Sequence, residues 1–149
     1  MFSKIKAGMD KALAGLAAES SKFKNRSFME AVVASCALVS AADGSISSEE
    51  KNKMMGYLRN SNELKHFDVN EVIAFFEKMS SGFSFDAAIG KAEALKVIGK
   101  LRGKEDQGRL MIRVACAIGA ADGDFDAKEK AVIQEICRDL GLNPADFDI

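Results

Sequence analysis

Signals for the start of a helix divide this chain more clearly than any other feature. A Ser or Asp followed three residues later by Glu forms a capping box, in which two side chains pair with two backbone amides at a helix N-terminus. Asn followed by Pro is a second start signal, because Pro favours the first helical position. The signals are Ser27–Glu30, Ser47–Glu50, Asp68–Glu71, Asp126–Glu129 and Asn143–Pro144. With apolar residues at helical spacing, they predict helices over 3–20, 28–42, 48–60, 69–80, 86–102, 106–121 and 127–140, and a turn at 144–147.

The composition agrees with helices and argues against a sheet. No segment shows sustained alternation of apolar and polar residues, and the chain has no Thr, no Trp, one Tyr and one Pro. Thr and aromatic residues favour strands, whereas the abundant Ala favours helices. A chain of 149 residues suits a single core. We therefore expect an all-α fold of seven to eight helices in a single compact domain. The N-terminal arm spans 1–24 and the helical domain proper spans 25–149.

Two predicted helices are apolar around most of their circumference and end in nearly the same way. Residues 28–42 and 110–121 have the pattern of interior helices, and we expect them to form a central pair. Residues 38–51 read LVSAADGSISSEEK and residues 117–130 read AIGAADGDFDAKEK, with six of fourteen positions identical. Each copy is a buried helix, an Asp-Gly turn and a capped helix. The chain is therefore predicted to contain an internal pseudo-twofold repeat of helix–turn–helix units.

Both turns present acidic side chains at a repeated spacing. Asp43 precedes Glu50 by seven residues, as Asp122 precedes Glu129. Hard divalent cations bind clustered carboxylate oxygens. Because the chain has only one His, we expect Ca²⁺, Mg²⁺ or Mn²⁺ rather than Zn²⁺. One shared site and two separate sites both fit this spacing. The candidate metal ligands are Asp43, Glu50, Asp122, Asp124, Asp126 and Glu129.

Helix capping offers a second interpretation of the same acids. Glu50 and Glu129 are the third-position acids of capping boxes, and Asp-Gly is a common turn dipeptide. Capping explains Asp43 and Asp122 less well, because a negative charge at a helix C-terminus opposes the helix dipole by about 0.3–1 kcal/mol. A metal site and simple caps therefore remain alternative interpretations of the sequence.

The charges and thiols exclude several classes of protein. Lys and Arg total 21 and Asp and Glu total 22, a balance that argues against a generally basic nucleic-acid binder. The longest run without a charge, 31–42, has 12 residues, whereas a membrane-spanning helix needs about 20. Cys36, Cys116 and Cys137 fall in apolar segments, where we expect them to pack in the core as unreactive thiols.

The first 24 residues combine apolar side chains at helical spacing with several lysines. Asp10 and Lys11 interrupt the apolar run, so we expect no cleavable signal peptide. Two interpretations stay open: a helix that packs on the domain or frays, and a helix that binds a membrane surface or a partner. The apolar stripe consists of Phe2, Ile5, Met9, Ala12, Leu13 and Leu16.

Over nearly its whole length, including the N-terminal arm, the chain resembles the TerB-like family of bacterial tellurite-resistance proteins. The resemblance rests on the A-A-D-G units at 41–44 and 120–123, on FSFDAAIGK at 83–91 and on the closing L-G-L-N-P turn at 140–144. It implies an all-helical domain with a divalent-cation site built from the Asp and Glu that recur in both units. It also implies partners among other tellurite-resistance proteins, including an integral membrane protein, at the inner face of the cytoplasmic membrane.

These inferences lead to three hypotheses about function. The first is a non-enzymatic cytoplasmic module in which cation binding neutralises the acidic turns and presents a surface to a protein partner. The second is a metal-independent adaptor whose acidic patch binds a basic partner directly. The third is an enzyme with a carboxylate-held metal, for which the sequence shows no dedicated base or pocket. We expect a monomer that binds no nucleic acid, and peripheral contact with a membrane through the N-terminal arm stays one of the two interpretations of that arm.

Overall fold

The computed structural model describes residues 25–42, 46–60, 64–121 and 126–149. These residues form α-helices and short 3-10 helices, and no strand occurs among them, which confirms the predicted all-α fold. The predicted helix over 3–20 lies outside the described residues. The α-helices are α2 (Arg26–Ser40), α3 (Ser48–Arg59), α4 (Val69–Phe85), α5 (Ala87–Ile98), α6 (Glu105–Ala121) and α7 (Ala127–Asp139). The 3-10 helices are η1 (Gly99–Leu101) and η2 (Pro144–Phe147).

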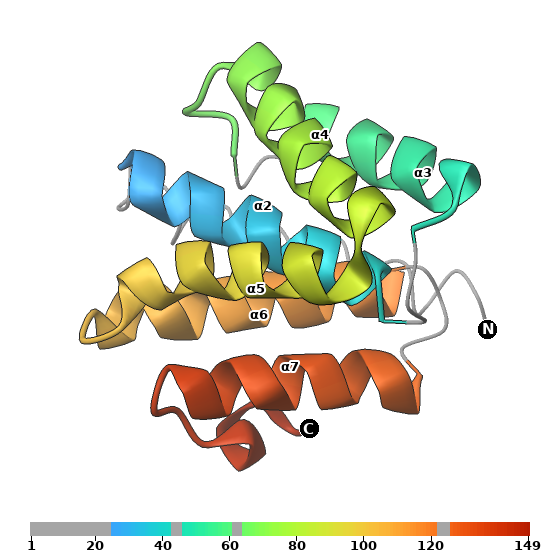
Figure 1. Cartoon of the computed structure of the whole chain (residues 1–149). Helices are drawn as coiled ribbons and strands as arrows, with labels where there is room; N and C mark the ends of the chain where they lie inside the picture. Colours follow the sequence, from blue (N-terminus) through green and yellow to red (C-terminus); the bar gives the residue numbers. More distant parts are fainter. Residues whose placement is uncertain (1–24, 43–45, 61–63, 122–125) are drawn as a thin grey trace, which may run out of the picture.

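Helix α2 lies at the centre of the molecule and packs against all five other α-helices (Figure 1). Every residue from Phe28 to Val39 except Glu30 is buried. The helix nevertheless contains serines, whose hydroxyls bond to the preceding turn. Ser35 Oγ donates to the Val32 carbonyl at 2.7 Å, and Ser40 Oγ donates to the Cys36 carbonyl at 2.9 Å. Each hydroxyl therefore has a hydrogen-bond partner within its own helix, although it is partly or fully removed from water.

Helix α6 is the second interior helix, as the sequence predicts. It packs against α2 on one side and α7 on the other. Its central residues are almost fully buried, although Arg113 reaches the surface. The burial confirms both members of the predicted central pair, but only α2 is enclosed by the other five helices. The buried residues of this segment are Leu110, Met111, Ile112, Val114 and Ala115.

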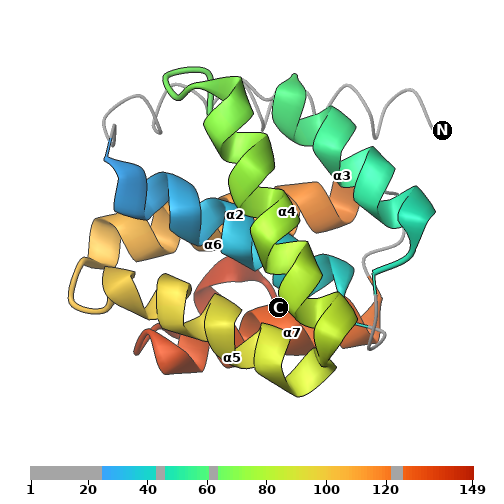
Figure 2. The same ribbon diagram turned by 45° about the horizontal axis from the view of Figure 1, so that its top comes forward.

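Helices α2 and α6 run side by side in the same direction, so their C-termini lie at the same end of the molecule (Figures 1 and 2). Helices α3 and α7 both begin at that end. We call this region the turn end, defined by the last turns of α2 and α6 and the first turns of α3 and α7. The fold therefore places the last turns of α2 and α6 and the first turns of α3 and α7 on one side of the molecule.

Helices α4 and α5 form a tight corner at Asp86, which caps α5. Asp86 Oδ1 accepts hydrogen bonds from the amides of Ala88 at 2.9 Å and Ile89 at 3.1 Å. The next turn of α5 passes so close to α4 that a Cβ atom at Gly90 would lie 2.6 Å from the backbone nitrogen of Phe83. Only glycine fits this position without a shift of one helix against the other.

Three predicted helix boundaries are wrong. Helix α2 begins at Arg26 rather than residue 28, because Asn25 and not Ser27 is its N-cap: Asn25 Oδ1 accepts from the Phe28 amide at 2.8 Å. Helix α4 continues past residue 80 to Phe85, because Phe83 extends its buried stripe. The segment predicted as one helix over 86–102 is instead α5 followed by η1.

The C-terminal end follows its sequence signals. Gly141 ends α7 with a φ of +73°, and the amide of Leu142 donates to the Cys137 carbonyl at 2.8 Å. This is the left-handed glycine stop expected after Leu140. Asn143 then caps η2 by accepting from the Ala145 amide at 3.1 Å, with Pro144 as the first residue of that helix. Both signals are therefore confirmed.

The pseudo-twofold repeat stays a prediction. The described residues have the expected order, since α3 follows α2 and α7 follows α6, each with a capped start. The Asp-Gly dipeptides that define the repeat, at 43–44 and 122–123, lie outside the described residues. Shared order and shared position at the turn end are compatible with the repeat, but neither requires the two units to superpose.

Candidate functional site

The predicted metal ligands belong to the two units whose helix termini lie on the same side of the molecule, at the turn end. Helix α2 ends at Ser40 and α6 at Ala121, while α3 begins at Ser48 and α7 at Ala127. All four termini lie at this end of the molecule in two views (Figures 1 and 2). The described ligands Glu50, Asp126 and Glu129 sit at the starts of α3 and α7. The fold therefore brings acids from distant parts of the sequence to one side.

Asp126 and Glu129 form the predicted capping box at the start of α7. Asp126 Oδ1 accepts from the Glu129 amide at 2.8 Å, and Glu129 Oε1 accepts from the Asp126 amide at 3.5 Å. Both residues are partly buried. Their negative charges lie near the positive end of the helix dipole, which stabilises them. The structural role that the sequence offered for these acids is thus confirmed.

The start of α3 uses a serine where α7 uses an aspartate. Ser47 Oγ accepts from the Glu50 amide at 3.1 Å and caps the helix. Glu50 is half-buried, and Glu49 beside it is exposed. The two units therefore differ in charge at matching positions, since Ser47 stands where Asp126 stands in the second unit. Any cation site would draw more of its charge from the α7 side.

The chemistry of these donors fits a hard cation. A carboxylate has two oxygens and about four lone-pair directions, so a cap bond at Oδ1 of Asp126 leaves room for an ion at the same group. The candidate ligand atoms of these side chains are carboxylate oxygens, which suit Ca²⁺ and Mg²⁺ rather than metals that prefer thiolate ligands. The first-turn acids could therefore contribute to a cation site while they cap their helices.

The remaining predicted ligands, Asp43, Asp122 and Asp124, lie outside the described residues. Within the described part of the chain, no group of three or more His, Cys, Asp or Glu side chains is close enough to hold a metal ion. Glu50, Asp126 and Glu129 alone therefore do not make a complete site. The six-residue ligand set stays a prediction, and it depends on the three acids of the turns.

Substitution of Asp126 separates its capping role from its charge. Asp126→Ala should lower the free energy of unfolding by about 1 kcal/mol, because the Glu129 amide loses its acceptor. Asp126→Asn should retain most of the stability, since Asn is an equally good N-cap. Urea denaturation of both variants measures the difference. Equal losses in the two variants would mean that the carboxylate charge, and not the cap, stabilises this helix start.

The three cysteines differ in burial. Cys36 and Cys137 are buried, which confirms the prediction of core thiols, and Cys116 is half-buried against the same core. Burial raises the pKa of the Cys116 thiol to about 11, with a smaller contribution from nearby Cys137. Burial likewise raises the pKa of Cys137 to about 11. Thiols with such pKa values stay protonated at neutral pH, so they are poor nucleophiles and poor metal ligands.

Two surface features were not predicted from the sequence. A groove of about 370 Å³ lies between the end of α3 and the start of α4. At the other end of α4, Phe85 is 81% exposed and Ile89 of α5 is 44% exposed. Val69 and Ile73 of α4 are the sequence signal nearest to the groove, but their apolar character alone does not show whether they face a neighbouring helix or solvent. The groove is lined by Arg59, Val69, Asn70, Ile73, Ala74 and Glu77.

In the part of the chain that the structure describes, each helix is too short or too polar to span a lipid bilayer.

Comparisons with known proteins agree on one family. A family model described as tellurite resistance protein TerB matches residues 29–149. A curated relative from Alcaligenes sp, named tellurium resistance protein TerB, is 42% identical over 113 residues, which cover 76% of this chain and 93% of the relative. No solved structure matches the chain. The family match includes all six predicted metal ligands and leaves the N-terminal arm outside.

Proposed function

Because this chain belongs to the TerB family of tellurite-resistance proteins, we propose that it is a non-enzymatic module that binds a hard divalent cation at its turn end. The bound state would dock other tellurite-resistance proteins, including an integral membrane protein. This places the module in the cytoplasm, at the inner face of the membrane, with peripheral lipid contact through the arm at 1–24. The observation that carries the proposal is that the ends of α2 and α6 and the starts of α3 and α7 lie on one side of the molecule.

The parallel course of α2 and α6 supports a site shared by the two units. Parallel neighbours bring their C-terminal carbonyl ends together, and the negative ends of two helix dipoles then face the same region. Asp43 and Asp122 follow those ends in the sequence, so they add charge to a region that is already electronegative. A divalent cation supplies the compensating positive charge. This arrangement gives the two aspartates a role that capping does not.

The residues of this chain would act by position and charge. Asp43, Asp122 and Asp124 would supply oxygens from the turns, while Glu50, Asp126 and Glu129 would supply them from the first turns of α3 and α7. Neutralising these acids removes their mutual repulsion and fixes the starts of the two helices relative to each other. A partner would then meet an ordered, less negative surface. Removal of the cation would restore the repulsion and weaken docking.

Calorimetric titration of the full chain with Ca²⁺, Mg²⁺, Mn²⁺ and Zn²⁺ tests the proposal. We expect saturable binding of at least one of the first three ions, and a loss of affinity of about tenfold or more, equivalent to about 1.4 kcal/mol, in Asp43→Asn with Asp122→Asn. The matched control is Asp106→Asn, which removes an exposed acid from the first turn of α6 at the opposite end. Saturable binding by none of the ions, or equal binding by both variants, contradicts the cation site.

A metal-independent adaptor is the second candidate, and the confirmed capping box favours it. Asp126 and Glu129 already have a structural role, so a cation is not needed to explain them. In this case the acidic turn end would attract a basic partner directly through long-range charge. Capture of the partner in the presence of a chelator, with loss on Asp43→Asn and Asp122→Asn, supports the adaptor. Loss of capture with chelator alone supports the cation-dependent module.

A further inference from the structure

The corner between α4 and α5 presents apolar side chains to solvent. Phe85 is the last residue of α4, Ile89 lies in the first turn of α5, and both are exposed. All residues from 84 to 89 are exposed as well, so no other part of the described chain covers this corner. Grouped apolar side chains on a surface mark a place where something binds. The proposed cation site does not include them.

The packing of the corner does not depend on either side chain. Phe83, two residues before Phe85, is buried, and Gly90 of α5 lies against it. Residues on the inner side of the corner therefore make the contact between α4 and α5. Phe85 and Ile89 lie on its outer side, where they are available to a ligand.

The two helices that form the corner carry an excess of positive charge. Residues 78–104 contain six basic and two acidic residues, a net formal charge of +4 in a chain whose total is −1. Three of the six basic side chains form ion pairs with other helices. These pairs are Lys91 with Glu135, Lys100 with Glu30 and Arg102 with Asp139.

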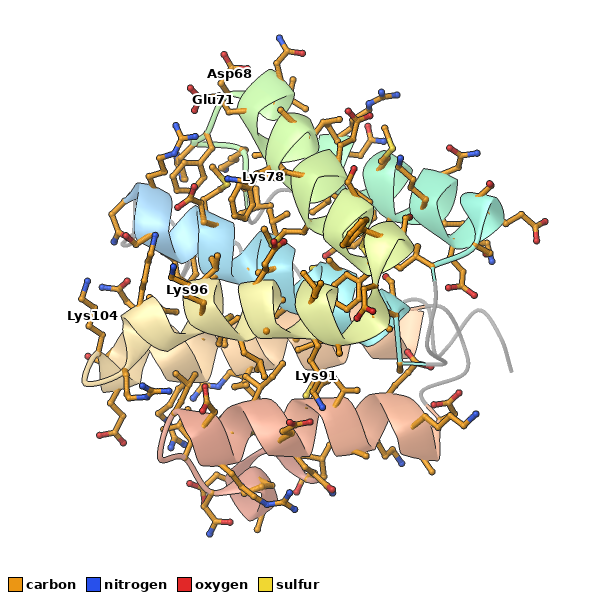
Figure 3. The ribbon with its side chains drawn as sticks, in the orientation of Figure 1. Asp68, Glu71, Lys78, Lys91, Lys96 and Lys104 are labelled. Carbon is orange, nitrogen blue, oxygen red and sulfur yellow. The ribbon has the colours of Figure 1, made fainter. Side chains whose placement is uncertain are left out.

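The other three basic residues, Lys78, Lys96 and Lys104, are exposed and form no ion pair within the described part of the chain. Lys78 precedes Phe85 by seven residues on α4, and Lys96 follows Ile89 by seven residues on α5. Seven residues are two helical turns, or about 10 Å, so each lysine shares a helix face with one exposed apolar side chain. Figure 3 shows Lys78 and Lys96 on one side of the molecule. We call Lys78, Phe85, Ile89 and Lys96 the basic corner.

The two acidic residues of this segment are held against the helices. Asp86 Oδ1 accepts from the amides of Ala88 and Ile89, so the start of α5 offsets its charge. Glu93 lies against α4, where its Oε2 atom is 2.6 Å from the position of a Cβ atom at Gly82. Positive charge therefore remains in excess at the basic corner.

We propose that the basic corner binds the surface of an anionic lipid bilayer. Phe85 and Ile89 enter the boundary between headgroups and acyl chains, while Lys78 and Lys96 lie at the headgroup phosphates. Buried apolar area and attraction to anionic lipids together set the strength of peripheral membrane binding. The inference rests on the proposed location at a membrane, and it gives the folded domain a lipid contact of its own besides that of the arm.

The composition of the corner favours lipid over an acidic protein. Protein interfaces are enriched in arginine and depleted in lysine, whereas the basic side chains without an ion pair here are all lysines. The nearby Arg102 is already bound to Asp139, with its Nη2 atom 3.1 Å from Oδ2. The apolar side chains also stand on an exposed corner, which can enter a fluid bilayer without a complementary cavity.

A tryptophan at position 85 reports insertion, because the chain has no Trp of its own. Full-length Phe85→Trp is mixed with vesicles of equimolar phosphatidylcholine and phosphatidylglycerol, with a chelator present so that the cation site plays no part. We expect its emission to shift to shorter wavelengths and brominated acyl chains to quench it. Val69→Trp, at the other end of α4, is the control and should stay unchanged.

The outcomes separate this inference from the proposed function. An unchanged emission at residue 85, or equal shifts at residues 85 and 69, overturns the basic corner. If the protein still sediments with the vesicles in that case, the arm makes the lipid contact and the proposed location is retained. Absence of sedimentation contradicts both. Soluble polyglutamate that shifts the emission at residue 85 as strongly as the vesicles do would identify an acidic protein as the ligand and overturn the proposal.

Charge variants provide an independent readout. Lys78→Gln with Lys96→Gln should lower the partition coefficient between vesicles and buffer by about tenfold or more. Lys53→Gln with Lys65→Gln removes the same charge from exposed sites on α3 and in the turn before α4, and should change the coefficient by less than about twofold. Equal losses in the two double variants would mean that net charge alone governs binding, which overturns the basic corner.

A matched pair of apolar positions tests the other half of the contact. Ile89→Ser removes an apolar side chain from the first turn of α5, and Val69→Ser does the same in the first turn of α4. The two side chains are 44% and 42% exposed, so neither change should disturb the core. Only Ile89→Ser should weaken binding to the vesicles, and equal effects of the two changes contradict insertion of the corner.

Discussion

Replacing Phe76 with Ala will lower the free energy of unfolding by about 3–5 kcal/mol. Phe76 lies in the middle of α4, is fully buried and is among the largest side chains of the core. Removing the ring deletes its apolar contacts and leaves a cavity that the neighbouring helices fill only in part. A domain has a total stability of about 5–15 kcal/mol. Urea denaturation should therefore show a much lower midpoint with nearly the same slope.

Phe85→Ala is the matched control on the same helix. Phe85 is the last residue of α4 and is 81% exposed, so its removal should change the free energy of unfolding by less than about 0.5 kcal/mol. The two variants share the same chemical change and differ only in burial. A similar loss in both would show that α4 does not pack on the core through the face that contains Phe76.

The second large effect is expected for Gly90→Ala. The added methyl would meet the backbone nitrogen of Phe83 at 2.6 Å and its Cα at 2.7 Å. Backbone atoms cannot rotate away as a flexible side chain can, so α4 and α5 must separate. Overpacking of this kind destabilises by about 1–3 kcal/mol and sometimes more. Urea denaturation measures the loss of stability. Amide NMR signals that shift along both helices would show that the helices have separated.

Gly56→Ala provides the control, because the same change should have the opposite sign there. Gly56 lies inside α3, and apart from its chain neighbours and the backbone of its own helix no atom lies within 4 Å of an added Cβ. Alanine in a helix interior is better than glycine by about 0.5–1 kcal/mol. We therefore expect a stabilised variant. Destabilisation by both substitutions would mean that loss of glycine, rather than contact with Phe83, explains the effect at Gly90.

The helices could be predicted from the sequence because their ends carry local signals. Asp126 with Glu129, and Gly141 after Leu140, act through bonds within one turn, and the structure contains those bonds. The start of α2 was misassigned because Asn25 and Ser27 are both good N-caps and lie two residues apart. The close approach at Gly90 depends on two helices at once. No local pattern reports such a contact, so the α4–α5 corner could not be predicted.

The candidate site, like the fold, could be predicted from the sequence only in part. The sequence correctly placed Glu50, Asp126 and Glu129 at helix starts, because spacing decides that role. It could not determine that α2 and α6 run in parallel and carry both units to one end, because helix direction depends on long-range packing. The groove on α4 was missed for a related reason. Whether Val69 and Ile73 face a neighbour or solvent depends on where α3 ends.

The central position of α2 has a consequence for how the molecule opens. Its backbone amides are screened from water by five helices, so hydrogen exchange at its middle residues requires those helices to move away together. The sequence contains two similar units, but α2 packs against the helices of both of them. Neither half can therefore detach while the other keeps its native form. We therefore expect a change of charge at the turn end, where α2 ends, to alter the stability of the whole helical domain and not of one unit alone.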